Sequence, residues 1–370
     1  MKFTCLQENL AKGLSIVNKA VSVRAPLPIL SNVLINAEDG RLKLSAFNME
    51  TGISTYVGAS VEKEGAITVP ARLLSEFVSL LSPGTITGEL KDSVLHLSSG
   101  GTKSKFVGMN ASDYPELPQM SEKLQVLELA PQEFANAINA VGFSAAVDDS
   151  RPVLGGILLD YDKGILTAAS ADGFRLSEKV LSVNKKGSAF SVVIPAKTLI
   201  EVARLLGGSE SPIKFALDAN DNLALFEADG ILISTRIIDG TFPDYKKLIP
   251  AETSLTVEFS AAELLEAVKL TNVFAKELNS AISLTFDPEG AIYLSSAAQE
   301  SGENKSQVLA VVSGEKLEMS FNAKFLLDFL NNIKAERVVF ATNGSMLPGL
   351  LKPAGEEGYL HIIMPLRVQS

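Results

Sequence analysis

The sequence has few of the residues that catalysis and covalent cross-linking most often use. Its 370 residues include one cysteine, two histidines and no tryptophan. A single cysteine excludes a disulfide within the chain and is typical of a reducing compartment, so we expect Cys5 to be a small buried residue in the first strand. His96 and His361 both fall where apolar and polar residues alternate, and we expect them in strands rather than as general bases.

Familiar active-site motifs are also absent. The sequence has no phosphate-binding loop, no GxGxxG after a strand, no zinc-ligand spacing and no nucleophile elbow. The glycine pairs Gly155-Gly156 and Gly207-Gly208 lack the Lys-Ser/Thr that follows in a phosphate loop, and we interpret them as tight turns. We therefore predict a non-catalytic protein without cofactor or metal. The alternative is an enzyme with an unfamiliar active site.

Long hydrophobic runs are missing as well. No stretch approaches the roughly 20 apolar residues of a membrane span, and the first residues do not resemble a signal peptide. We expect a soluble, cytoplasmic protein with no membrane partner. Lys and Arg number 33 against 43 Asp and Glu, which gives a formal net charge of −10. This balance argues against binding nucleic acid through overall charge, but it leaves room for a local basic surface.

A pattern that occurs three times is the most informative feature present. Each copy is a short apolar strand, then Pro-Ala or Asn-Ala, then a basic residue that opens an amphipathic helix. The copies are residues 67–81 (ITVPARLLSEFVSLL), 192–206 (VVIPAKTLIEVARLL) and 319–333 (MSFNAKFLLDFLNNI). Pro70, Pro195 and Asn322 anchor them at intervals of about 126 residues, which is the size of a domain. The sequence therefore predicts three tandem domains, at residues 1–120, 126–250 and 251–370.

A second helix is expected in each domain, followed by alternating strands. The helical patterns run over residues 8–21, 132–143 and 262–274, and Ser260 with Glu263 fits a capping box. Asp39-Gly40, Asp229-Gly230 and Asn343-Gly344 suit tight hairpin turns between strands. Each domain is thus expected to combine two helices with antiparallel sheet, which is the α+β class.

The helices of the repeated pattern share a polar face. Each carries a basic residue, an acidic residue one turn later and then a polar one: Arg72, Glu76 and Ser79; Lys197, Glu201 and Arg204; Lys324, Asp328 and Asn331. The opposite face is apolar: Leu73, Leu74 and Phe77; Leu199, Ile200 and Ala203; Phe325, Leu326 and Phe329. A solvated face with i, i+4 ion pairs is one interpretation. The threefold recurrence favours a common functional role for these polar faces. Lys12, Lys19 and Arg24 add positive charge nearby.

In these features the chain resembles the bacterial DNA sliding clamp family, the β subunit of DNA polymerase III. The resemblance covers the whole chain. Its marks are residues 1–4 (MKFT), 24–30 (RAPLPIL), 69–72 (VPAR), 171–176 (ADGFRL), 239–245 (DGTFPDY) and 364–367 (MPLR).

The resemblance implies a processivity factor of DNA replication, with two chains joined head to tail in a six-domain ring. Helices would line a hole that holds duplex DNA without sequence preference. The implied pore residues are Arg24, Arg72, Lys197, Lys324, Lys12 and Arg204. The implied homodimer interface includes Phe106, on an expected edge strand at residues 103–107, with Val273 and Phe274. A non-catalytic ring scaffold that does not encircle DNA is the alternative.

The resemblance also implies a pocket for short linear motifs. Its partners would be the polymerase III α subunit, the clamp loader δ subunit, and other polymerases and repair proteins. The matching positions are Arg151, Leu154, Ala171, Gly173, Phe174, Arg175, Leu176, Pro243, Leu248, Met346, Ile362, Met364 and Pro365. Leu154, Leu176 and Ile362 taken singly fit a core, whereas Arg151 and Arg175 are expected at a polar rim. The family commonly has Thr and His where this chain has Ala171 and Phe174, which favours a more apolar pocket.

Overall fold

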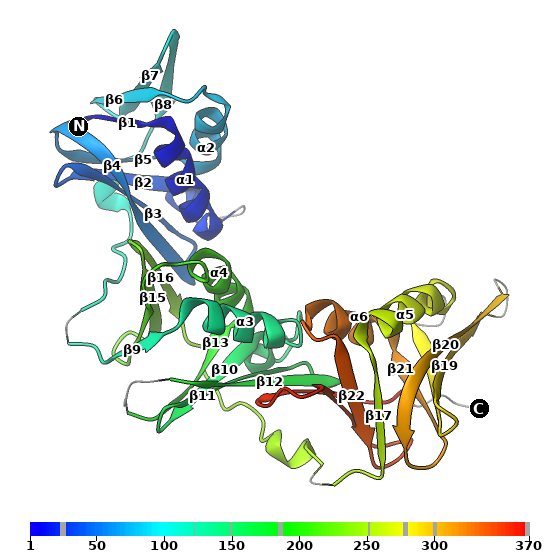
Figure 1. Ribbon diagram of the computed structural model, residues 1–370. Helices are drawn as coiled ribbons and strands as arrows, with labels where there is room; N and C mark the ends of the chain where they lie inside the picture. Colours follow the sequence, from blue (N-terminus) through cyan, green and yellow to red (C-terminus); the bar gives the residue numbers. More distant parts are fainter. Residues whose placement is uncertain are drawn as a thin grey trace. The chain divides into compact units, whose positions relative to one another are not determined.

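The computed structural model describes residues 1–22, 27–121, 123–148, 150–183, 188–250, 252–276, 280–298 and 302–366. Within these residues the same order of elements occurs three times: a strand, a helix, four strands, a helix and three strands (Figure 1). The predicted α+β class with two helices in each repeat is confirmed.

The elements of each repeat have the following bounds. The first contains β1 (Lys2–Leu6), α1 (Gln7–Val17), β2 (Asn32–Glu38), β3 (Arg41–Phe47), β4 (Thr51–Lys63), β5 (Gly65–Pro70), α2 (Ala71–Leu80), β6 (Thr85–Lys91), β7 (Val94–Ser99) and β8 (Thr102–Val107). The second contains β9 (Val126–Leu129), α3 (Pro131–Gly142), β10 (Gly156–Asp162), β11 (Ile165–Ala171), β12 (Arg175–Ser182), β13 (Phe190–Pro195), α4 (Ala196–Leu206), β14 (Ile213–Asp218), β15 (Leu223–Ala228) and β16 (Ile231–Arg236). The third contains β17 (Leu255–Ser260), α5 (Ala261–Ala275), β18 (Ala281–Asp287), β19 (Ala291–Ala298), β20 (Gly302–Ser313), β21 (Leu317–Asn322), α6 (Ala323–Asn332), β22 (Arg337–Thr342), β23 (Gly349–Pro353) and β24 (Tyr359–Ile363).

The helix starts follow the predicted signals. At α6 the Asn322 side chain caps the helix by accepting a hydrogen bond from the Lys324 amide at 2.9 Å. At α5 the Ser260 hydroxyl accepts from the Glu263 amide over a longer distance, 3.4 Å. The first helix is shorter than predicted, because α1 ends at Val17 and a 3₁₀ turn covers Asn18–Ala20.

Two of the three predicted tight turns have the expected geometry. Asp39-Gly40 joins β2 to β3 and Asp229-Gly230 joins β15 to β16, and all four residues have positive φ, as a type I′ hairpin requires. The prediction for Asn343-Gly344 is wrong. Six residues, 343–348, connect β22 to β23, and the Thr342 hydroxyl donates to the carbonyl of Pro348 at 3.1 Å across this loop.

Strands of neighbouring repeats pair with each other, so the contacts divide the chain into two units. The first unit comprises Met1–Ala135 and Glu201–Ile237 and holds a 12-stranded sheet in which β4 pairs with β16. The second comprises Asn136–Ile200 and Ile238–Ser370 and holds a 12-stranded sheet in which β12 pairs with β24. The predicted limits of the three domains stay a prediction.

In each unit the helices pack on sheet through their apolar faces. α1 and α2 lie side by side, and α1 packs on β3 and β4 (Figure 1). This approach is so close that a Cβ at Gly13 would lie 2.5 Å from a methyl of Val57. In the second unit α5 contacts α6, and Phe329 of α6 is buried in one core cluster with Phe259 and Phe321 of the strands.

The buried helix faces are narrower than predicted. Leu73 is 57% exposed and Ile200 39% exposed, whereas Leu74 and Leu199 are fully buried. The described part of the chain contains no helix both long and apolar enough to cross a membrane.

Candidate functional site

The tight turn at residues 171–175, which joins β11 to β12, contains four of the residues predicted to form a partner pocket. The Asp172 carboxylate shapes this turn, because one of its oxygens, Oδ1, accepts from the amides of Phe174 at 2.8 Å and Arg175 at 3.0 Å. Gly173 has φ +93°, a conformation that side chains disfavour. The Asp172 side chain therefore stabilises the backbone of the turn to which it belongs.

Arg151, which directly precedes the 3₁₀ turn Pro152–Gly155, stabilises the turn at residues 171–175. Its Nη2 atom donates to the carbonyl of Asp172 at 2.8 Å. A Cβ at Gly173 would lie 2.9 Å from the Arg151 Nη1 atom, so the guanidinium occupies the place of a side chain. Arg151 is exposed, as expected for a polar rim.

Arg175 does not lie at the rim, and that prediction is wrong. The residue is 7% exposed, and its guanidinium pairs with Asp172 Oδ2 at 3.0 Å and with Asp328 Oδ2 at 2.6 Å. The guanidinium carbon also lies 4.7 Å from the ring centroid of Phe325. Two carboxylates and an aromatic face compensate for burial of the charge, so Arg175 is a structural link between β12 and α6.

Predicted pocket residues also form an apolar floor near the turn. Leu154, Leu176 and Ile362 are buried in one cluster with Phe242, Tyr245 and Leu350, as their core interpretation predicted, and Ala171 packs against it. Phe174, Leu248 and Met346 are 59%, 49% and 54% exposed, and Pro243 is exposed next to Phe242. Solvent-exposed apolar side chains therefore lie near a buried apolar cluster. This combination is typical of binding surfaces.

The segment after β24 joins the turn to the third repeat. β24 pairs with β12 in antiparallel register, with Arg175 opposite Ile363, and this pairing brings the chain past the turn. The Met364 amide donates to the carbonyl of Phe174 at 2.8 Å, and the Leu366 amide donates to that of Ser320 at 2.7 Å. Met364 and Pro365 are half-buried.

His361 lies beneath this site and was not predicted to have a role there. It is fully buried between the rings of Phe143 and Phe329, with centroid distances of 5.5 Å and 5.0 Å. Its Nδ1 atom shares a 2.8 Å hydrogen bond with the Ser177 hydroxyl. Burial, aided by the charge of Arg175, lowers the pKa of His361 to about 3, so the ring is neutral at pH 7. The alternating pattern predicted its place in a strand but not its complete burial.

The predicted DNA-contacting residues are exposed where the structure describes them. In the first unit Lys12 lies on α1, Arg72 on α2 and Arg204 on α4, and Arg204 donates from Nε to Glu201 at 2.9 Å. In the second unit Lys197 is the second residue of α4 and Lys324 is the second residue of α6. Arg24 lies outside the described residues, as does Arg367 of the MPLR segment.

The residues predicted at the dimer interface differ in exposure. β8 is the terminal strand of its sheet, as predicted, but Phe106 is only 4% exposed and packs edge-on against Phe77 at 5.4 Å. Val107 beside it is 73% exposed. At the end of α5, Val273 is 62% exposed and Phe274 is half-buried.

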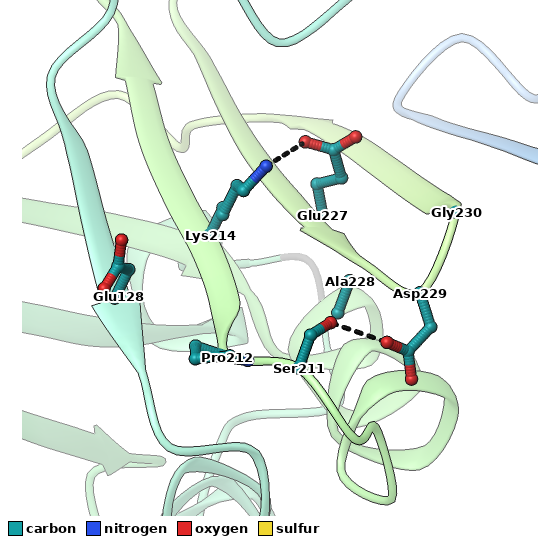
Figure 2. A pocket seen from close by; sticks show the side chains of 8 residues that line it. All are labelled: Glu128, Ser211, Pro212, Lys214, Glu227, Ala228, Asp229 and Gly230. Carbon is teal, nitrogen blue, oxygen red and sulfur yellow. Dashed lines mark hydrogen bonds and ion pairs between the residues drawn. The ribbon is translucent and has the colours of Figure 1, made fainter.

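A separate pocket in the first unit contains none of the residues predicted for the partner pocket, the DNA contact or the dimer interface (Figure 2). It is lined by Glu128, Ser211, Pro212, Lys214, Glu227, Ala228, Asp229 and Gly230. Lys214 pairs with Glu227 at 3.7 Å, and the Ser211 hydroxyl donates to Asp229 at 2.5 Å, which lowers the pKa of that carboxyl. Its polar groups thus bond to each other. Across the described ranges no group of His, Cys, Asp and Glu could hold a metal ion.

The fold places the chain in the class of DNA polymerase sliding clamps. It aligns with the solved structure of the Bacillus subtilis sliding clamp at a TM-score of 0.95, with 26% identity and all of both chains covered. A Pseudomonas aeruginosa sliding clamp bound to griselimycin aligns with a TM-score of 0.93 and 27% identity, again over both whole chains.

The sequence comparisons are more specific than the fold. Family models for the N-terminal, central and C-terminal domains of the DNA polymerase III beta subunit match residues 1–118, 128–244 and 246–367. Beta sliding clamps from Synechococcus elongatus and Streptomyces coelicolor are 31% and 30% identical to the chain, which they cover completely. The chain belongs to this family, the beta sliding clamps of DNA polymerase III. The predictions of a replication clamp and of a non-catalytic processivity subunit are confirmed.

Proposed function

We propose that two copies of this chain close head to tail around duplex DNA and tether the replicative polymerase to it. The observation that carries this proposal is that one chain contains all three beta-subunit domains and matches its relatives from end to end. Two chains joined by the same contact used twice form a closed ring with two-fold symmetry. We place this activity in the cytoplasm.

The pore would touch DNA weakly. Lys12, Arg72, Lys197 and Lys324 are exposed on helices, and Arg24 and Arg204 are the further candidates. A ring stays on DNA by topology, so a few phosphate contacts suffice, and stronger contacts would slow sliding. The net charge of −10 would discourage DNA from wrapping elsewhere on the protein.

Partners would bind at a pocket of the second unit, which we name the partner pocket. It consists of Arg151, Leu154, Ala171, Gly173, Phe174, Leu176, Pro243, Leu248, Met346, Ile362, Met364 and Pro365, with Arg175 beneath it. We propose that it receives a short peptide with Gln at its start and Leu and Phe near its end. The polymerase III α subunit, the clamp loader δ subunit and repair proteins would supply such motifs. Burial of a Leu and a Phe gives about 3–6 kcal/mol before the cost of ordering the peptide, so we expect micromolar affinity.

Retention on circular DNA tests the ring. The protein is loaded on a nicked circular plasmid with a clamp loader and ATP, freed of unbound protein by gel filtration, and then treated with a restriction enzyme that cuts once. Encirclement predicts co-elution with the circle and release after linearisation. Protein that never co-elutes, or that stays bound to linear DNA with free ends, would support a scaffold that does not encircle DNA.

A further inference from the structure

The buried guanidinium of Arg175 connects two elements that are far apart in the sequence. One carboxylate, Asp172, lies in the turn before β12, and the other, Asp328, lies in the middle of α6. The Arg175 side chain is only 6% exposed, so its charge depends on these partners rather than on water. Asp172 alone would neutralise it, which leaves the role of Asp328 to be explained.

We propose that Asp328 is a positioning residue for the partner pocket, and that it acts through Arg175 to hold the turn at residues 171–175. The inference rests on the proposed peptide-binding function of that pocket. It assigns a role in partner binding to a residue of α6 that has no place among the predicted pocket residues.

The first step is the control of the turn by one carboxylate. Asp172 uses Oδ1 for the amides of Phe174 and Arg175, and Oδ2 for Arg175 Nε at 3.0 Å. The direction of the guanidinium therefore fixes the direction of the carboxylate, and the carboxylate fixes the backbone that presents Phe174. A guanidinium free to rotate would leave both amides less well bonded.

The second step is the contact that side chains of α6 make with the Arg175 guanidinium. Asp328 accepts from Arg175 Nη1 at 2.6 Å, while Phe325, one turn earlier on α6, lies near the guanidinium carbon with its ring centroid at 4.7 Å. Nε and Nη1 thus donate to carboxylates of two different elements, and the aromatic ring packs against the group between them. Asp172 and two side chains of α6 therefore hold the Arg175 side chain in place together.

The third step leads to groups at the surface of the pocket. The Phe174 carbonyl accepts from the Met364 amide at 2.8 Å, so a displaced turn would displace Met364 as well. The Phe174 ring stacks near Phe325 with a centroid distance of 6.4 Å. Loss of Asp328 would therefore disorder two predicted peptide contacts, although the Asp328 side chain is only 31% exposed and belongs to neither strand of the turn.

The substitution Asp328→Asn tests this inference because it removes one charge and keeps the size of the side chain. Asp172 still neutralises Arg175, so the variant is expected to fold. Glu201→Gln is the matched control, since Glu201 has the equivalent place on α4 and pairs with Arg204 on its own helix. Asp328→Glu keeps the charge and serves as the rescue variant.

Two measurements are made on the full-length protein. Hydrogen–deuterium exchange of fragments that cover residues 171–176 reports the turn, with fragments from β2 as the internal reference for global stability. Titration with a synthetic peptide that has Gln at its start and Leu and Phe near its end reports the pocket. Loss of a charge-assisted hydrogen bond predicts about tenfold faster exchange and about tenfold weaker peptide binding in Asp328→Asn. Glu201→Gln should change neither the exchange rate nor the peptide affinity. Asp328→Glu should restore most of the slow exchange and most of the peptide affinity.

A double substitution tests the route through Arg175. In an Arg175→Met background, Asp328→Asn should change peptide affinity less than about twofold further, because the two residues would act as one unit. If the effects of the two substitutions on the free energy of peptide binding are fully additive, Asp328 does not act through Arg175. Unchanged exchange and unchanged affinity in Asp328→Asn would overturn the proposal. If the unaltered protein does not bind the peptide at all, the pocket itself is wrong, and the exchange data alone then decide whether Asp328 holds the turn.

Discussion

At the scale of single residues, burial decides the chemistry of His361. Its pKa is lowered to about 3 from an ordinary value of 6.5, mainly by burial and further by Arg175. Below pH 6.5 the unfolded chain therefore binds a proton that the folded chain does not. The contribution of this residue to the free energy of unfolding is constant above pH 6.5 and falls as the pH drops from 6.5 toward 3, by about 1.4 kcal/mol per pH unit.

The substitution His361→Gln should remove this dependence. Denaturation with urea at pH 6.5 and pH 5.0 should show the unaltered protein losing about 2 kcal/mol more than the variant over that interval. His96→Gln, which removes the other histidine, half-buried on β7, should leave the difference in place. Equal losses in the unaltered protein and His361→Gln would mean that His361 is protonated in the folded state.

Gly173 is a second residue with a specific requirement. Gly173→Ala combines a φ of +93° with a Cβ placed 2.9 Å from Arg151, so the alanine must strain the turn and displace the guanidinium. We expect a loss of about 1–3 kcal/mol in unfolding free energy and weaker peptide binding. Gly58→Ala is the control, since a Cβ there meets no atom within 4 Å. Equal effects of the two substitutions in calorimetry would refute the argument.

At the scale of secondary structure, the sequence predicted most helices and hairpins because their signals are local. The three helices that start at Ala71, Ala196 and Ala323 begin where the repeated pattern places them, directly after Pro70, Pro195 and Asn322. Helical spacing shows which side chains share a face, but it does not show what covers that face. Leu73 was therefore predicted to be buried but is exposed. Arg175 lies on the strand β12, and its burial depends on a contact with α6 that is distant in the sequence.

The pairing of strands that are distant in the sequence could not be predicted for a related reason. Any two alternating strands satisfy the same pattern, so nothing local selects β16 as the partner of β4 or β24 as the partner of β12. The proposed partner pocket depends on the second of these pairings, because it brings Met364 to Phe174. The pocket residues were predicted from the family resemblance, whereas the role of Asp328 required the structure.

The two helix caps of the third repeat give a prediction at this scale. Asn322→Ala removes an acceptor 2.9 Å from the Lys324 amide and should cost about 1 kcal/mol in unfolding free energy. Ser260→Ala removes a bond of 3.4 Å and should cost less. Asn322→Asp, which keeps the acceptor, should be near neutral. Chemical denaturation measures the loss of unfolding free energy in each of the three variants. A larger loss in Ser260→Ala than in Asn322→Ala would contradict the prediction.

At the scale of the whole molecule, closure of the proposed ring should depend on an apolar contact at the end of α5. Val273 is 62% exposed and Phe274 is half-buried, so both retain apolar surface that a second chain could cover. Phe274→Ala should raise the dimer dissociation constant at least about tenfold, as truncation of a buried aromatic predicts. Sedimentation of the unaltered protein should give a mass about twice 39.3 kDa. Leu347→Ala, at an exposed position of the β22–β23 loop, is the control. An unchanged dissociation constant would remove Phe274 from the interface.

DNA binding by the whole ring should be weak and spread over several helices. Each neutralised phosphate lowers the logarithm of the binding constant by about 0.9 per logarithm of salt concentration, and a sequence-specific repressor reaches about 10. We expect a slope below about 5 here, because the chain is acidic and its exposed helix cations lie on different elements.

The substitution Lys324→Glu should make this slope smaller by about one for each phosphate that the lysine neutralises. Lys352→Glu, at an exposed position of β23, is the control and should leave the slope unchanged. Fluorescence anisotropy with a short duplex at several salt concentrations measures both variants beside the unaltered protein. A slope near 10, a preference for one DNA sequence, or equal effects of the two charge reversals would contradict a ring that holds DNA by topology, because such a ring needs only a few phosphate contacts from its helices.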